Sequence, residues 1–222
     1  MKVINLHDKD SFKLIILDIE IMKSTENKIY NGDMAAGALL IAESRKIAQL
    51  LLKNVDKVQW HKAIVIDNIL QKRSSAAAIR QARLIKNRLV LMDKNLWQLV
   101  YDGSSEVSTQ ALLAASIKHS RLVGDFMDIV LRQHWQTFND KISEIDWSRF
   151  LESCAQTDPR VDIWKESTKA KLKQVLFRIL AEAKYIDSTR NRKLLPVSIA
   201  PEVKKYLIEK KENYVIRCME IT

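Results

Sequence analysis

The residues best placed for catalysis lie in the segment KHSRLVGDFMDIVLRQHW, residues 118–135. Asp125 and Asp128 are three positions apart, so a helix would carry both carboxylates on one face. Paired carboxylates can hold a divalent metal ion or transfer protons to and from a substrate. His119 and His134, near the two ends of the segment, are the histidines nearest to this pair.

An ordinary amphipathic helix accounts for the same segment without chemistry. Phe126, Ile129 and Val130 would then turn inward, and the two aspartates would face solvent. We favour this interpretation because the chain has no Gly-rich phosphate loop and neither a G-x-S-x-G nor an H-E-x-x-H motif. Cys154 and Cys218 lack the spacing of a disulfide framework or a zinc site, and nothing beside them would activate a thiol. We therefore expect a protein that is not an enzyme and that uses no metal or other cofactor.

A second kind of chemistry, the binding of a polyanion, is indicated by residues 71–89, QKRSSAAAIRQARLIKNRL. The segment has six Lys or Arg and no Asp or Glu, so no ion pair within the helix offsets the repulsion among its cations. Four of the six are Arg, whose planar guanidinium suits bidentate contact with phosphate or guanine. A charged helix face is usually only solvated, but the lack of acids favours nucleic-acid binding here.

Helical spacing divides this segment into two faces. The apolar face is formed by Ala78, Ala82, Ile85 and Leu89. The opposite face is formed by Arg73, Arg80, Arg83 and Arg88, with Lys86 beside them. Ser74 or Ser75 can cap the start of the helix, and the small residues that follow would let its first N–H groups approach a phosphate.

The elements around this helix favour a helix-turn-helix. A helix is expected over residues 55–66 and a short connector over residues 67–73, so that the basic helix would be the second of the pair. A further helix is expected over residues 167–183. It is followed by YIDSTRNRKLLPVSI, in which two short apolar pieces flank a polar tip with three basic residues. This pattern predicts a β-hairpin wing before a last helix that begins at Pro201.

The composition and the distribution of charge agree with these expectations. Of 222 residues 47% are hydrophobic, and only four Gly and three Pro are present, which favours long helices with short connections. The net charge of +10 is the sum of +1 for residues 1–70, +6 for 71–89, −4 for 90–166 and +7 for 167–222. The positive excess therefore sits in the two segments predicted to bind a polyanion. No apolar stretch approaches the ~20 residues of a membrane-spanning helix, and we expect a cytoplasmic protein.

The sequence thus predicts an all-α protein with helix-turn-helix-like elements and a small C-terminal β-hairpin wing. We expect an N-terminal extension over residues 1–28, a helical domain with the helix-turn-helix-like unit over 29–100, and a helical domain with a winged-helix-like part over 101–222. The predicted nucleic-acid contacts are Lys72, Arg73, Ser74, Ser75, Arg80, Arg83, Lys86, Lys171, Arg190, Arg192 and Lys193.

Four segments in order resemble the BrxA family, the small accessory proteins of bacterial BREX phage-resistance systems. They are GALLIAESRKIAQLLL, NILQKRSSAAAIRQARLIKNRL, RLVGDFMDIVLRQHW and STKAKLKQVLFRILAEAKYID with the later LLPVSIAPEV, which together span roughly residues 34–205. The resemblance implies a cytoplasmic helical protein with DNA-binding capacity. It implies partners among the methyltransferase, ATPase and phosphatase-like proteins of the system, and it implies no catalytic residues.

The leading hypothesis is a non-enzymatic protein that binds double-stranded DNA, mainly through phosphate contacts and with weak sequence preference. One alternative is an adaptor whose basic and acidic surfaces bind other proteins of the defence complex. A third possibility is an RNA-binding helical module, which the same basic pattern would suit equally well.

Overall fold

The computed structural model describes residues 29–221, and this part of the chain is helical. Its elements are, in order, η1 (Asp33–Ala36), α2 (Ile41–Leu52), α3 (Lys57–His61), η2 (Lys62–Ile66), α4 (Ser75–Leu89), α5 (Lys94–Asp102), α6 (Ser105–His119), α7 (Arg121–Asp125), η3 (Phe126–Leu131), α8 (Arg132–Gln136), α9 (Glu144–Thr157), η4 (Pro159–Val161), α10 (Glu166–Glu182), α11 (Pro201–Glu209) and α12 (Asn213–Met219). The mostly helical fold predicted from the sequence is confirmed. None of these helices within residues 29–221 is both long and apolar enough to cross a membrane.

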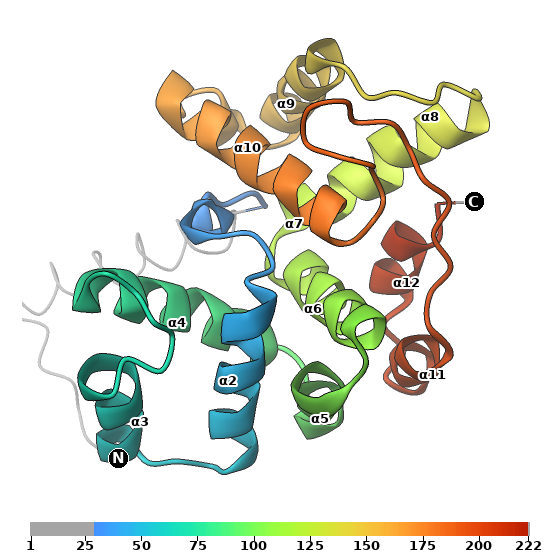
Figure 1. Cartoon of the computed structure of the whole chain (residues 1–222). Helices are drawn as coiled ribbons and strands as arrows, with labels where there is room; N and C mark the ends of the chain where they lie inside the picture. Colours follow the sequence, from blue (N-terminus) through green and yellow to red (C-terminus); the bar gives the residue numbers. More distant parts are fainter. Residues whose placement is uncertain (1–28, 222) are drawn as a thin grey trace, which may run out of the picture.

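Helix α6 lies at the centre of the molecule (Figure 1). Every residue from 107 to 117 is buried, and α2, α4, α5, α7, α11 and α12 all pack against it. Its sequence VSTQALLAASI permits this, because small residues between the leucines let neighbours approach from all sides. The amide of Gln110 donates to Ser198 O at 3.0 Å and accepts from Ala200 N at 2.6 Å, which fixes the loop before α11.

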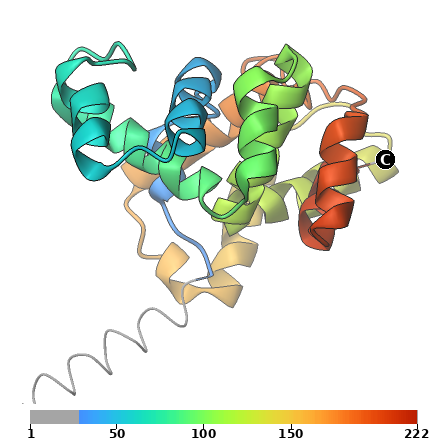
Figure 2. The same ribbon diagram turned by 90° about the horizontal axis from the view of Figure 1, so that it is seen from below.

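Helices α3 and α4 lie at one end of the molecule, and α8 lies at the opposite end. Figures 1 and 2 show this separation from two directions at a right angle. A single hydrophobic cluster nevertheless joins the elements, from Tyr30 to Ile221. The expected division into units at residues 29–100 and 101–222 stays a prediction, and the expected extension over residues 1–28 lies outside the described residues.

The predicted C-terminal β-hairpin wing is wrong. Between α10 and α11 the chain forms an irregular loop, and the only β-pairing within residues 29–221 is two isolated bridges, Lys141 with Lys193 and Ile186 with Leu194. The carboxylate of Asp187 accepts hydrogen bonds from the backbone N–H of Lys193 and from the side chain of Asn191, at 2.9 and 2.6 Å. Backbone hydrogen bonds from Asp187 N to Lys193 O at 2.9 Å and from Leu195 N to Tyr185 O at 3.0 Å also join the two sides of this loop, but they do not continue into a ladder of strand pairs.

The start of the first long helix also differs from the sequence pattern. Asp33 is of a residue type that can cap a helix beginning at Met34, but residues 33–36 form only the short 3₁₀ turn η1. Leu40 then adopts a left-handed conformation with φ of 53°, and α2 begins at Ile41. This bend carries η1 onto α4 and α10, so the core residue Met34 lies in η1 and the core residue Leu39 lies in the loop before α2.

Candidate nucleic-acid interface

Helix α4 has the cap and the apolar face that its sequence predicts. The Oγ of Ser74 accepts a hydrogen bond from Ala77 N at 3.2 Å, so one free N–H at the helix start is satisfied. The expected apolar face is buried, and Leu84 is buried as well. This face packs against α2, η2 and α6, and η1 also contacts α4, so only the side that these elements leave uncovered points to solvent.

Three arginines on or beside α4 are exposed and unpaired. Arg73, Arg80 and Arg83 make no ion pair with any residue among 29–221, whereas many other arginines and lysines of the described chain bind carboxylates. Ser74 and Ser75, at the start of the helix, are exposed as well. We call the exposed predicted contacts from 73 to 86 the α4 basic face: Arg73, Ser74, Ser75, Arg80, Arg83 and Lys86.

Lys72 is the predicted contact of this segment that lies outside the α4 basic face. Its ammonium is paired with Glu43 on α2, and both side chains are largely buried. Although burial acts to raise the pKa of Glu43, the hydrogen bond from Lys72 holds that pKa below its ordinary value. Lys72 therefore ties the connector to α2, and the carboxylate that it binds would compete with a phosphate.

The connector itself is held rigidly. The side-chain amide of Asn68 donates to Lys72 O at 2.8 Å and accepts from Lys72 N at 3.0 Å, while the ammonium of Lys46 donates to Ile69 O at 2.6 Å. Asn68 and Gln71 both adopt positive φ. The helix–connector–helix order is as predicted, but the eight residues from 67 to 74 exceed the three or four of a helix-turn-helix turn.

A groove lies between α4 and the continuous helical stretch of α3 and η2. It has a volume of about 430 Å³, and its floor includes Trp60, Ile64 and Ala82. The polar residues that line the groove are Lys57, His61, Arg83 and Lys86, and none of them carries a negative charge. The Lys86 ammonium lies 4.6 Å from the centre of the Trp60 ring, a cation–π contact that fixes this side chain at the groove. The groove therefore extends the α4 basic face without adding a carboxylate.

The expectation that Arg88 faces solvent is wrong. Its side chain is only 2% exposed, and the guanidinium donates to Ala38 O and Gly37 O at 2.5 and 3.0 Å. Burial lowers the pKa of Arg88 to about 10, against a smaller opposing effect of Glu182. Arg88 therefore secures the loop that leads into α2, and η1 covers the position that the helical spacing assigned to the surface.

The C-terminal predicted contacts do not extend the α4 basic face. Arg192 binds Glu144 on α9 and lies 5.1 Å from the Phe177 ring, while Lys193 lies 3.7 Å from Asp140. Arg190 is exposed, and Lys171 on α10 donates to Gln174 at 3.0 Å. These residues belong to the part of the molecule around α9 and α10, whereas α4 packs on α2, η2 and α6 (Figure 1).

The candidate catalytic carboxylates do not form a shared site. Asp125 is 6% exposed and accepts hydrogen bonds from Tyr30 Oη at 2.9 Å, Tyr214 Oη at 2.7 Å and Arg121 Nε at 2.8 Å. Asp128 instead pairs with Arg132 and Arg217. Within residues 29–221 no three His, Cys, Asp or Glu residues are grouped as metal ligands.

The alternative interpretation, in which residues 118–135 form an amphipathic helix with both aspartates facing solvent, is also wrong in part. Asp125 points inward, and Ile129, which was expected to pack in the core, is exposed. Both cysteines are buried, and burial raises the pKa of each thiol to about 12. These thiols stay protonated at neutral pH, as their sequence surroundings indicated.

We expect Mg²⁺ to leave the melting temperature unchanged, because Asp125 and Asp128 are already bound to separate partners. Thermal unfolding with millimolar Mg²⁺ and with EDTA should give superimposable curves. An increase of several degrees that the Asp128→Asn variant abolishes would contradict this expectation, since a ligand that binds the folded state raises its stability.

Substituting Gly124 should disturb the Asp125 cluster. A Cβ at this position would lie 2.3 Å from Tyr214 Oη, so Gly124→Ala must displace the tyrosine from Asp125. We expect a loss of about 2–3 kcal/mol in the free energy of unfolding, from overpacking and a lost buried hydrogen bond. Urea unfolding measures this loss. Gly32→Ala is the matched control because nothing lies within 4 Å of its Cβ, and equal stabilities of the two variants would contradict the expectation.

Comparison with known proteins identifies the family of this chain. A family model described as BrxA matches residues 28–211. The chain belongs to the BrxA family. BrxA proteins that resemble it include the BREX protein BrxA of Paramagnetospirillum magneticum, 44% identical over 87% of this chain and 97% of the relative. The BREX protein BrxA of Escherichia coli is 35% identical over 87% of this chain and 91% of the relative.

A solved structure shares the fold of this BrxA protein. A crystal structure of an uncharacterised protein from Magnetospirillum magneticum superimposes with a TM-score of 0.81 at 43% identity, covering 87% of this chain and all of that one. The resemblance seen in four sequence segments is therefore confirmed over a longer stretch. The match to the family model begins at residue 28, where the expected N-terminal extension ends.

Proposed function

We propose that this BrxA protein binds double-stranded DNA through the α4 basic face, as a non-enzymatic component of a BREX phage-defence complex in the cytoplasm. The observation that carries the proposal is that Arg73, Arg80 and Arg83 are exposed and make no ion pair within residues 29–221. Guanidinium groups without internal carboxylates are available to phosphates, and no internal ion pair has to break on binding.

The start of α4 supports the same role. The N–H groups of a helix N-terminus attract a phosphate, and here they follow Ser74 and Ser75 with only small residues beside them. One phosphate bound at this end and other phosphates bound by the arginines would belong to one DNA strand that runs past the helix. Contacts of this kind position the protein without reading bases, so we expect weak sequence preference.

A gel-shift titration over a salt series tests the proposal. Four to six phosphate contacts predict that the logarithm of the association constant falls with the logarithm of salt with a slope of about −4 to −5 for duplex DNA. Duplex DNA, single-stranded DNA and RNA of equal length should be compared, and duplex DNA should bind most tightly. The DNA-binding proposal would be overturned if the protein does not bind duplex DNA at low salt, or if it clearly prefers RNA.

A second candidate function is an assembly adaptor between the methyltransferase, ATPase or phosphatase-like proteins of the system. The groove beside α4 favours it, since its apolar floor with Trp60 and Ile64 would suit a protein side chain better than a phosphate. Pull-down with the purified BREX components, in the presence of a nuclease, separates this function from association through DNA.

A further inference from the structure

The groove between α4 and the stretch of α3 and η2 differs in charge from other hollows on residues 29–221. Lys57, Arg83 and Lys86 line it together with His61, and no carboxylate of the described chain does so. Four other hollows on the described residues each include at least one aspartate or glutamate. The groove therefore favours an anionic occupant more than those four hollows do.

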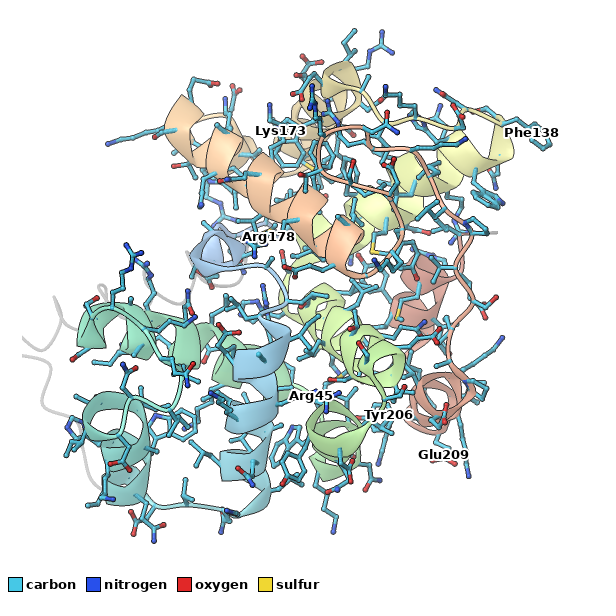
Figure 3. All side chains as sticks on the ribbon, viewed as in Figure 1. Arg45, Phe138, Lys173, Arg178, Tyr206 and Glu209 are labelled. Carbon is cyan, nitrogen blue, oxygen red and sulfur yellow. The ribbon has the colours of Figure 1, made fainter. Side chains whose placement is uncertain are left out.

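Two of the cations that line the groove are available to an occupant. Lys57 and Arg83 are exposed, and they make no ion pair with any residue among 29–221. Lys173 and Arg178, which Figure 3 labels, show the contrasting situation, because each of them binds a glutamate of this chain. A carboxylate that entered the groove would thus pair with cations without breaking an internal ion pair.

The carboxylates at the two ends of the α3–η2 stretch are already engaged. Asp56 caps α3, where it accepts a hydrogen bond from Gln59 N at 2.8 Å. Asp67 binds the Lys62 ammonium at 3.2 Å. Neither aspartate lines the groove, so the cations there are not neutralised by these two neighbours.

The apolar part of the groove indicates what else the occupant must carry. Trp60, Ile64 and Ala82 form the floor, and Ile79 on α4 lines the groove while remaining 41% exposed. A phosphate cannot remove such surface from water, whereas a leucine or an aromatic side chain can. Aromatic and arginine side chains are also enriched at the centres of protein–protein interfaces. The groove therefore suits apolar side chains that are flanked by carboxylates.

The length of the groove suits a short helix. Its lining residues lie between positions 57 and 65 on one side and between positions 79 and 86 on the other. At the rise of an α-helix each side is about 12 Å long, or about two turns. An amphipathic helix of two or three turns can lay its apolar face in a groove of this length, with anchors at i, i+3 or i+4 and i+7.

We propose that the groove binds an acidic amphipathic segment of a partner protein, and that this segment and DNA exclude each other. The exclusion follows because Arg83 and Lys86 line the groove and also belong to the α4 basic face. In this respect the inference rests on the proposed DNA-binding function, whereas the docking of the segment does not. A partner that presents such a segment would release the protein from DNA.

Fluorescence polarisation with a synthetic peptide tests the docking. The probe is a fluorescein-labelled peptide in which pairs of glutamates alternate with pairs of leucines, and it is titrated with the full chain in the absence of DNA. The same peptide with serine in place of leucine has equal charge, and it should bind about tenfold more weakly or less. In a second titration, the unlabelled leucine peptide should displace a labelled DNA duplex.

Two pairs of variants locate the binding. Ile79→Gln should weaken peptide binding by about 5-fold to 10-fold and leave duplex affinity within about twofold of the wild type. Val58→Gln is its control, because Val58 is 77% exposed on α3 and does not line the groove. Arg83→Gln should weaken both peptide and duplex binding, whereas Arg80→Gln, outside the groove on the same helix, should weaken duplex binding alone. Circular dichroism establishes that each variant is folded.

The docking is overturned if the leucine peptide does not bind, if the serine peptide binds equally well, or if Ile79→Gln leaves peptide affinity unchanged. Loss of duplex affinity in Ile79→Gln as large as the loss of peptide affinity would mean that the groove holds nucleic acid instead. Simultaneous binding of peptide and duplex would overturn the exclusion. A protein that binds the peptide but no duplex would overturn the proposed DNA binding, and the exclusion with it, while the docking would stand.

Discussion

Replacing Arg80 and Arg83 together by glutamate should weaken binding to duplex DNA by about 30-fold to 100-fold at moderate salt. Two phosphate contacts are lost and two carboxylates are placed against the DNA backbone, so attraction becomes repulsion at the centre of the α4 basic face. The salt dependence should change as well, with the slope of the log–log plot becoming shallower by about 2. A gel-shift titration at three or more salt concentrations measures both quantities.

The control for this variant must carry the same change of net charge. Lys94→Glu combined with Lys211→Glu provides it, because both lysines are exposed, lie outside the α4 basic face and make no ion pair within residues 29–221. This control should lose no more than a few-fold in affinity, through the general field of the protein. Equal losses in the two double variants would mean that net charge alone determines binding and that α4 is not the contact surface.

Replacing Arg88 by alanine should destabilise the protein by about 3 kcal/mol. The side chain is among the largest that are fully buried, so its removal leaves a cavity, and the carbonyls of Gly37 and Ala38 lose their donors. The burial that lowers the pKa of Arg88 to about 10 shows that the charge itself is costly to hold, which offsets part of the loss. Urea unfolding measures the balance.

Arg80→Ala is the matched control for Arg88→Ala, since it removes the same side chain from an exposed position of the same helix. It should leave the stability within about 0.5 kcal/mol of the wild type, because alanine is favourable in a helix. Arg88→Met, which keeps most of the volume without the donors, should fall between the two. If all three variants unfold at the same urea concentration, the hydrogen bonds of Arg88 contribute no stability.

The local rules of helix formation predicted α4 well. The spacing of its apolar residues fixed the buried face, and Ser74 proved to be the cap because its hydroxyl can reach a free N–H. Helical spacing does not show which other segment of the chain covers a given face of the helix. Arg88 is buried because η1 folds back onto α4, and that contact depends on the left-handed residue Leu40 far away in the sequence.

The errors elsewhere have the same origin in tertiary contacts. Short apolar pairs such as Tyr185–Ile186 suit a strand and a buried loop equally, and here the Tyr185 hydroxyl donates to Met219 O inside the core. Asp125 is held inside by tyrosines at positions 30 and 214, which no local pattern connects to it. Arg192 was expected at the tip of a β-hairpin wing, but it lies in an irregular loop and binds Glu144, which is 48 residues away in the sequence on α9.

The two buried cysteines have a practical consequence for studying this protein in solution. Neither Cys154 nor Cys218 is accessible, and both thiols have a pKa raised to about 12. A single cysteine introduced at an exposed position, such as Asn87 on α4, would then be the reactive thiolate for a maleimide dye or a spin label. The distance from such a label to one on a DNA duplex could be measured by energy transfer without removing the native cysteines.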